Sequence, residues 1–217
     1  MTVPDLKADL HDYLRAARAA LLWKVDGISE YDARRPLVAT GTNLLGLVKH
    51  CATVEWGHFG AAFDRPFRTT LPWVGGDAEP DADMWAAADE TRAGLVELYR
   101  ELCAHSDTVI DELPLDTVGE VPWWPPEISR VTLQHMLVHT VAEVQRHAGH
   151  ADIVRELVDG SAGYSPGGAL LPDGDHQWWA ERRARLERIA RAADPLSPGS
   201  AAPPPAADPG RAPGSRR

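Results

Sequence analysis

The stretch Gln134-His-Met-Leu-Val-His-Thr-Val-Ala-Glu-Val-Gln-Arg-His-Ala-Gly-His150 lies in the longest helical pattern of the chain. It places His135, His139, Glu143 and His147 at successive steps of four residues. Each step advances roughly 40° around a helix and about 6 Å along it, so that neighbouring members of the row can aim at one point. We therefore expect one face of this helix to carry the chemistry of the protein.

Helical periodicity extends over most of the chain, and no alternating strand pattern of useful length interrupts it. The predicted helices are a first over Leu6–Val25, a second from Thr42 or Asn43 to about Phe63, a third from Asp81 or Asp83 to Leu113, a fourth from Ser129 to Leu157 with Gly160 beyond its end, and a fifth over Asp175–Ala193. On the fifth, we expect Trp178, Trp179, Leu186 and Ile189 to face inward. Four long helices with one more behind them predict an all-α fold, a four-helix bundle with an additional C-terminal helix.

The predicted domain boundary lies between residues 193 and 194. Residues 1–193 hold the helices, whereas residues 194–217 contain seven of the 18 prolines and no aromatic residue. Such a segment buries too little apolar surface to offset the entropy of ordering, so we expect a disordered tail. Two long predicted loops, 64–81 and 114–127, carry Trp73, Trp123 and Trp124. These tryptophans are expected to cover the end of the core, to line a ligand pocket, or to do both.

Composition excludes some classes of function. The chain has 217 residues, with 22 Lys plus Arg against 32 Asp plus Glu, a net charge of −10. This balance and the lack of a basic stripe argue against a nucleic-acid partner. No apolar run reaches about 18 residues and no targeting signal opens the chain, so we expect a cytoplasmic protein without a membrane partner. Cys51 and Cys103 are expected to be buried, reduced thiols rather than a disulfide.

Adjacent members of the four-residue row could bind one metal ion. Glu143 with His147 is the favoured pair, and His139 with Glu143 competes with it on spacing alone. The second helix offers His50 as a further ligand, whereas His58 follows it by two turns, about 12 Å of rise, and is less suited. A carboxylate and two imidazoles suit a divalent ion with an open position. The alternative, that these histidines only fill the core and surface, stays open at this point.

Five segments form a further pattern: Leu44-Leu-Gly-Leu-Val-Lys-His50, Ala142-Glu-Val-Gln-Arg-His-Ala-Gly-His-Ala-Asp-Ile-Val-Arg-Glu156, Asp81-Ala-Asp-Met-Trp85, Pro122-Trp-Trp124 and Trp178-Trp-Ala180. Together they resemble the DinB-like superfamily, specifically its actinobacterial branch of mycothiol-dependent transferases. The resemblance implies a DinB-type four-helix bundle with a metal on His50, Glu143 and His147. Many DinB-like proteins have a histidine at the position of Glu143. A glutamate at this position makes the predicted metal site similar to that of mycothiol-dependent maleylpyruvate isomerase. With a divalent ion, His/Glu/His leaves one net positive charge.

The resemblance further implies a metal-dependent S-transferase, as in detoxification, with zinc as the expected ion and nickel as the other candidate. Mycothiol or a similar small thiol would be the co-substrate. We expect Trp123 and Trp124, with Trp56 or Trp178, to hold an apolar electrophile. Arg146 and His150 are expected to orient the thiol. His139 is expected to line the pocket or to orient a metal-binding side chain by a hydrogen bond.

Two other functions stay open. One is a metal-dependent hydrolase, in which Glu55 is the base if it points inward. The other is a non-catalytic scaffold or sensor stabilised by its metal. A homodimer is compatible with all three functions.

Overall fold

A computed structural model describes residues 5–167 and 170–194 of the chain. It divides into two compact units, Met1–Leu171 and Pro172–Arg217, and each is described by itself. The division falls before the last helix, which the sequence analysis grouped with the bundle. The tail predicted for residues 195–217 lies outside the described residues.

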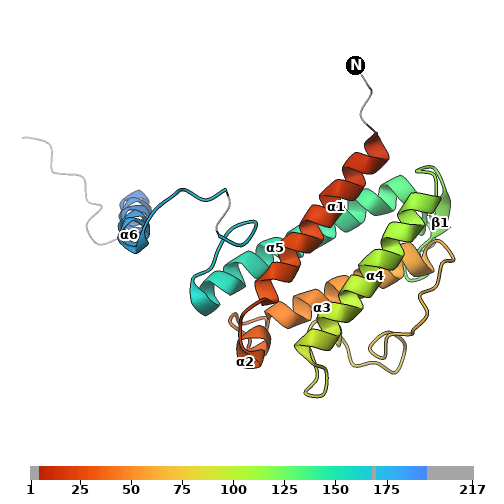
Figure 1. Ribbon diagram of the computed structural model, residues 1–217, viewed down its shortest axis with the longest axis horizontal. Helices are drawn as coiled ribbons and strands as arrows, with labels where there is room; N and C mark the ends of the chain where they lie inside the picture. Colours follow the sequence, from red (N-terminus) through yellow and green to blue (C-terminus); the bar gives the residue numbers. More distant parts are fainter. Residues whose placement is uncertain (1–4, 168–169, 195–217) are drawn as a thin grey trace, which may run out of the picture. The chain divides into compact units, whose positions relative to one another are not determined.

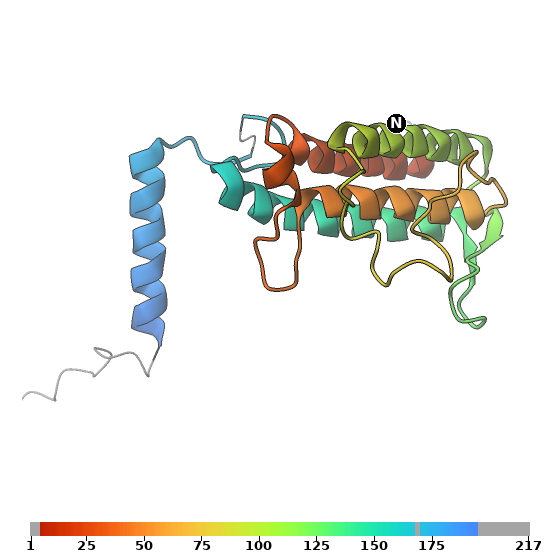
Figure 2. The same cartoon turned by 90° about the horizontal axis from the view of Figure 1, so that it is seen from below.

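The first unit is a four-helix bundle, as the sequence predicts (Figure 1). Its long helices are α1 (Leu6–Leu22), α3 (Leu44–Glu55), α4 (Arg92–Glu112) and α5 (Leu133–Asp159). Helix α1 packs mainly on α5, and α3 packs on both α4 and α5, so that the four run alongside one another (Figure 2). The shorter elements are the 3-10 turn η1 (Trp23–Val25), α2 (Glu30–Arg34), the π-helix η2 (Trp56–Ala61), and the antiparallel strands β1 (Val118–Glu120) and β2 (Arg130–Thr132).

Side-chain caps set the starts of the bundle helices. Asn43 accepts from the backbone N–H of Gly46 and begins α3, in agreement with one of the two predicted caps. Helix α5 begins at Leu133, capped by Thr132, rather than at Ser129. The sequence prediction missed this start because residues 130–132 pair with β1 as a strand.

The predicted start of the third helix is wrong by about ten residues. Helix α4 begins at Arg92, where Thr91 accepts from the N–H of Gly94. The preceding segment forms turns because Asp81 has a positive φ of 58° and the carbonyl oxygens of Ala86 and Ala87 accept from the Arg34 guanidinium instead of from helical amides.

A buried ion pair joins α1 to α3 inside the apolar core. Arg18 donates two hydrogen bonds to the Glu55 carboxylate, at 2.7 and 2.8 Å, and a third to Asp107 at 2.5 Å. Arg18 is 5% exposed and Glu55 is fully buried. A carboxylate paired in this way is not available as a base, so the structure removes Glu55 from the hydrolase hypothesis. Cys51 is buried, Cys103 is half-buried, and both are free thiols, in agreement with the sequence prediction.

We predict that Arg18→Met lowers the free energy of unfolding by about 3–5 kcal/mol, because it leaves the buried Glu55 carboxylate without its partner. Urea unfolding followed by circular dichroism measures this loss. The matched control is Arg15→Met, one turn earlier on α1, where the side chain is half exposed and the expected loss is below about 1 kcal/mol. Equal losses in the two variants would contradict the importance of the buried pair.

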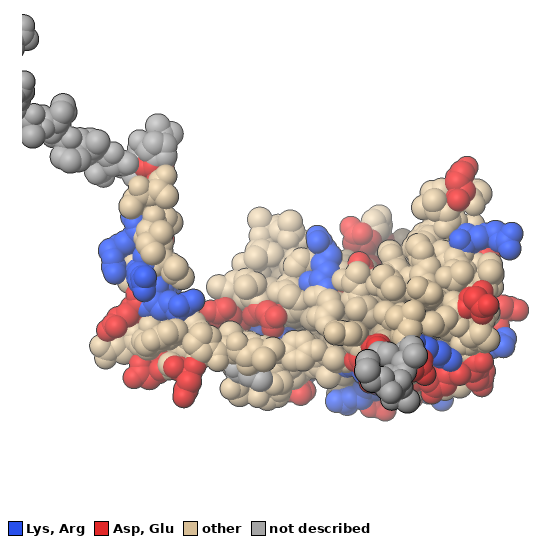
Figure 3. All heavy atoms as spheres, turned by 90° about the horizontal axis from the view of Figure 1, so that it is seen from above, with Lys and Arg blue, Asp and Glu red and all other residues tan. Residues whose placement is uncertain are grey.

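The second unit contains α6 (His176–Ala193), which Asp175 caps by accepting from the N–H of Trp178. Figure 3 shows basic side chains gathered along α6, which has five arginines against two glutamates, whereas acidic and basic side chains are interspersed on the visible face of the first unit. Within this unit α6 buries none of its residues, and the large apolar side chains for which the sequence predicts inward packing are exposed. Those side chains are Trp178, Trp179, Leu186 and Ile189. The amphipathic helix itself is confirmed.

No helix within residues 5–167 or 170–194 combines the length and the apolar character needed to cross a membrane.

Candidate metal centre

Three side chains converge between α3 and α5. His147 Nε2 lies 3.0 Å and His50 Nε2 lies 3.4 Å from the same oxygen, Glu143 Oε1. The two imidazole rings meet edge to face with centroids 4.6 Å apart. One ligand atom from each of the three residues lies within 4.8 Å of the others. The four-residue step on α5 supplies the Glu143–His147 pair, and the packing of α3 against α5 supplies His50.

The electrostatics of the cluster keep Glu143 ionised. Burial opposes its charge, but hydrogen bonds from His147 and His50 outweigh burial and lower the pKa of Glu143. Burial likewise opposes the charged form of His50, yet Asp83 and Glu143 raise the pKa of His50 above its usual value. Burial and the neighbouring His50 lower the pKa of His147. The ionised Glu143 carboxylate therefore faces two imidazole Nε2 atoms, at a position where a cation could take the place of an imidazole proton.

The donor set fits a divalent metal ion. Two imidazole nitrogens and one carboxylate oxygen are ordinary ligands of zinc and of related ions. His147 is 8% exposed, and its Nδ1 has no hydrogen-bond partner within the part of the chain that the structure describes. Its Nε2, by contrast, is directed at the cluster. The residues present could thus hold a metal with His50 and His147 bound through Nε2.

Asp83 supports the cluster from the loop before α4. The Nδ1–H of His50 donates to Asp83 Oδ2 at 2.7 Å. This hydrogen bond is the main cause that lowers the pKa of Asp83, so the carboxylate is ionised and can only accept. A carboxylate on Nδ1–H leaves Nε2 as the free ligand nitrogen. The sequence predicts Asp83 only as a possible start of the third helix, although it lies in the Asp81–Trp85 segment that carries the family resemblance.

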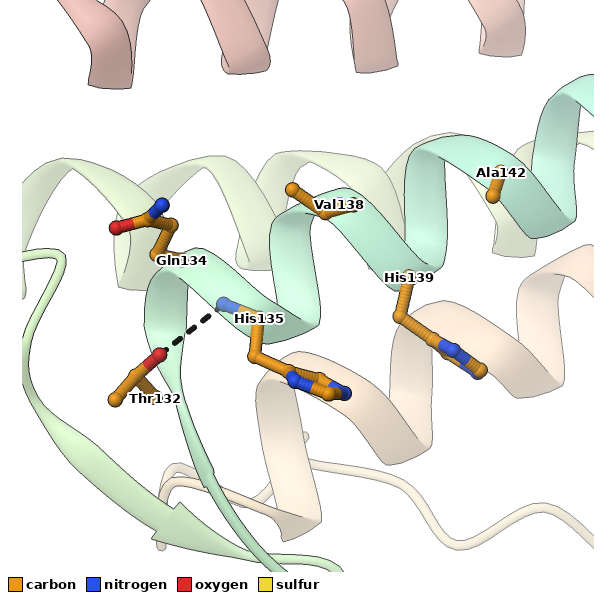
Figure 4. A pocket seen from close by; sticks show the side chains of 6 residues that line it. All are labelled: Thr132, Gln134, His135, Val138, His139 and Ala142. Atoms are coloured by element: carbon orange, nitrogen blue, oxygen red, sulfur yellow. Dashed lines mark hydrogen bonds between the residues drawn. The ribbon is translucent and has the colours of Figure 1, made fainter.

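A pocket of about 590 Å³ opens along the first turns of α5 (Figure 4). In Figure 4 the imidazoles of His135 and His139 extend from α5 toward the same side. The complete lining consists of Thr132, Gln134, His135, Val138, His139 and Ala142. His139 precedes Glu143 by one helical turn, and none of the three triad residues is part of the lining.

An aromatic group adjoins the pocket. The Trp124 ring lies 5.1 Å from His139 and 6.2 Å from His135, measured between ring centroids. Trp123 stacks on His58 at 6.4 Å with an interplanar angle of 10°. The Trp123 ring can approach this closely because a Cβ at Gly57 of η2 would lie 2.7 Å from its Cη2. The hairpin loop thus packs on the π-helix and brings both tryptophans next to the pocket.

The match to a family model decides the assignment. The mycothiol-S-transferase family model matches residues 9–160, well over half of the chain. The chain belongs to the mycothiol-S-transferase family. The matched range includes all three residues of the triad, Asp83 and the complete pocket.

A solved structure supports the fold. The crystal structure of a conserved protein from Enterococcus faecalis is similar, with a TM-score of 0.55 and 19% sequence identity over 73% of this chain and 100% of that chain. At this identity the likeness supports the fold alone. No curated protein shows significant similarity to the chain.

The structure separates the other predicted site residues of this mycothiol-S-transferase family member into three places. His139, Trp123 and Trp124 belong to the pocket and its aromatic group. His150 is exposed, and its ring contacts that of His147 at 5.4 Å. Arg146 is exposed on α5.

The two remaining tryptophans of the sequence prediction are not among the residues that line the pocket. Trp56 is partly buried against the core, and Trp178 lies in the second unit.

His58 is a buried neutral imidazole. It donates from Nδ1–H to Thr140 Oγ1 at 3.0 Å, because the Thr140 hydroxyl itself donates to the carbonyl oxygen of Met136 at 2.7 Å. Burial, followed by the neighbouring His139, lowers the pKa of His58 to about 3. The position of His58 in a π-helix, a feature common at functional sites, was not visible from the sequence.

We predict that the purified wild-type protein binds about one zinc ion per chain, and that alanine at His50, Glu143 or His147 abolishes this binding. Elemental mass spectrometry on protein dialysed against zinc measures the stoichiometry. The matched control is His139→Ala, one turn from Glu143 on the same helix, which should keep the ion. Loss of zinc in His139→Ala with retention in His147→Ala would favour the competing pair instead.

We predict that His58 makes stability fall with acid. Its pKa is about 3 in the folded chain against 6.5 for the free group, so the unfolded chain binds a proton that the folded chain excludes. The contribution of neutral His58 to the free energy of unfolding is fully present above pH 6.5 and is lost as the pH falls toward 3. The expected loss is about 2 kcal/mol between pH 7 and 5. Urea unfolding of wild type and His58→Asn, both with chelator, measures the difference. An equal pH dependence in both would refute it.

Proposed function

We propose that this protein transfers the sulfur of a low-molecular-weight thiol, with mycothiol as the foremost candidate, to an electrophilic carbon. The observation that carries the proposal is the convergence of His50, Glu143 and His147 in a chain of the mycothiol-S-transferase family, with a pocket one turn earlier on α5. A divalent ion held by the triad, zinc in the first place and nickel in the second, would supply a site for the sulfur and lower the thiol pKa from about 8.5 by several units.

The chain's own residues would divide the remaining work. Glu143 stays ionised and offsets one charge of the ion, and Asp83 holds His50 with Nε2 facing the cluster. Along α5 toward its start, the pocket at His135 and His139 would take the electrophile. Trp124 would exclude water from its apolar part.

The thiol would approach the triad from the part of α5 that follows Glu143. His150 is exposed next to His147, and Arg146 is exposed on the same turn, so both can reach the polar groups of a sugar-containing thiol. In the overall reaction a sulfur–carbon bond forms, the leaving group departs with its bonding pair, and the thiol proton passes to water. A reduced thiol requires a reducing compartment, so the proposal includes a cytoplasmic location.

The proposal predicts that thiol transfer depends on the triad. Zinc-loaded protein incubated with mycothiol and 1-chloro-2,4-dinitrobenzene should form the thioether and release chloride. Mass spectrometry follows the thioether and an ion electrode follows the chloride. Glu143→Ala should lower the rate by about 100-fold or more, in line with the loss of a metal-ligand residue.

Chelation separates this proposal from its alternatives. Removal of the metal should abolish transfer while the helical circular dichroism persists, and added zinc should restore the rate. A chain that unfolds on chelation and shows no turnover when loaded would support the scaffold instead. Transfer that persists in the chelated protein would contradict the metal-dependent proposal.

A further inference from the structure

Residues 81–90, which we term the strap, run from the end of the long loop to the start of α4 and carry Asp83 onto His50. The strap contains no regular helix or strand. A turn closes at its beginning, where the N–H of Met84 donates to the carbonyl oxygen of Asp81 at 2.8 Å. Asp81 has a positive φ of 58°, which directs the chain back toward α3. Asp83 lies inside this turn and reaches the Nδ1–H of His50 at 2.7 Å.

The strap is fixed to the face of α3 that carries His50. Lys49 donates to the carbonyl oxygen of Trp85 at 3.1 Å and to the Glu90 carboxylate at 2.8 Å. Only 3% of Lys49 is exposed, so its charge depends on these partners. The Asn43 amide donates to the carbonyl oxygen of Met84 at 3.3 Å. Lys49 and the capping residue Asn43 therefore hold two carbonyl oxygens and one carboxylate of the strap.

Gly46 makes the close approach possible. A Cβ at this position would lie 1.8 Å from the carbonyl oxygen and 2.5 Å from the carbonyl carbon of Met84. Both are backbone atoms, so a side chain at Gly46 would force the strap away from α3. Lys49 and His50 follow Gly46 by three and four residues, so both lie on the face of α3 that carries Gly46. Met84, next to Asp83 in the strap, thus lies against Gly46, one turn before His50.

A second helix, α2, also holds the strap. Arg34 of α2 donates to the carbonyl oxygen of Ala87 at 2.8 Å and contacts that of Ala86 at 3.3 Å. The N–H of Ala87 donates to the Glu90 carboxylate at 2.6 Å. Because the backbone of the strap is bonded to both α2 and α3, Asp83 has little freedom to leave His50.

We propose that the strap positions His50 for metal binding, so that Gly46 and Lys49 set the metal affinity without touching the metal. The inference rests on the proposed metal centre and adds to it a support outside the triad. The Asp83 carboxylate orients the imidazole and fixes the proton on Nδ1, which leaves Nε2 unprotonated for the ion. Gly46, Lys49 and Asp83 are thus positioning residues. Loss of such a hydrogen bond to a ligand histidine typically costs 10–100-fold in affinity.

The test is the zinc affinity of the full chain, measured by competition with a chromophoric chelator. Asp83→Ala should weaken binding by about 10–100-fold. Asp83→Asn should weaken it less, because the amide oxygen still accepts from Nδ1–H but carries no charge. Gly46→Ala should weaken binding although Asp83 is intact. The matched control is Gly76→Ala in the same loop, where a Cβ would meet no atom within 4 Å and affinity should not change.

A double variant tests whether the strap acts through Asp83. If it does, Gly46→Ala combined with Asp83→Ala binds zinc no more weakly than Asp83→Ala alone. Lys49→Met gives a second route to the same result if Gly46→Ala does not fold. The visible absorption of the cobalt(II) form should change in Asp83→Ala and Gly46→Ala and match wild type in Gly76→Ala.

The outcomes separate this inference from the proposed function. Wild-type affinity in Asp83→Ala, or additive losses in the double variant, would overturn the role of the strap and leave the triad intact. Failure of the wild-type chain to bind zinc would overturn the metal centre and, with it, the role of the strap.

Discussion

The packing of α3 against α5 is the contact on which the candidate site depends. Glu143 and His147 come from a single helix, but His50 reaches them only because apolar side chains of α3, from Leu44 to Val48, are buried in the bundle. The buried Arg18–Glu55 pair holds the same helix to α1 one turn beyond His50. Apolar burial brings the helices together, and the ion pair favours one arrangement of them.

Two sets of charged groups lie inside the bundle, and their partners distinguish them. Arg18 is matched by Glu55 and by Asp107, so that set is complete without a ligand. In the triad, by contrast, two imidazoles share one carboxylate oxygen, and the arrangement needs a proton or a cation between them. The first set is therefore structural, and the second is where chemistry is expected. The pocket on the same helix ends about one turn before the second set, at His139 and Ala142.

The sequence was sufficient for features that depend on local spacing. The four-residue step between Glu143 and His147 survives in the structure because a helix fixes it, and Asn43 caps α3 as its side chain predicts. The pairing with His50, from a facing helix, could be placed only through the family resemblance. The residues of the strap could not be assigned at all, because a loop docks through non-local backbone contacts that leave no periodic pattern.

The errors have related causes. Glu55, five residues after His50 on α3, is predicted as a possible base, but Arg18 of α1 pairs with its carboxylate. No local sequence pattern predicts a partner from another helix. The start of α5 was missed because Arg130–Thr132 pairs with β1, and two strands of three residues each are too short to show an alternating pattern. The amphipathic pattern of α6, by contrast, predicted the helix correctly.

The central claim is that His50, Glu143 and His147 together bind one divalent ion. Anomalous diffraction at the zinc absorption edge, from crystals of the zinc-loaded protein, tests it most directly. We expect a single strong peak in the anomalous difference map, at about 2.0–2.2 Å from His50 Nε2, His147 Nε2 and a Glu143 oxygen. A peak bound instead by His135 or His139, or no peak at the triad in protein that carries stoichiometric zinc, would contradict it.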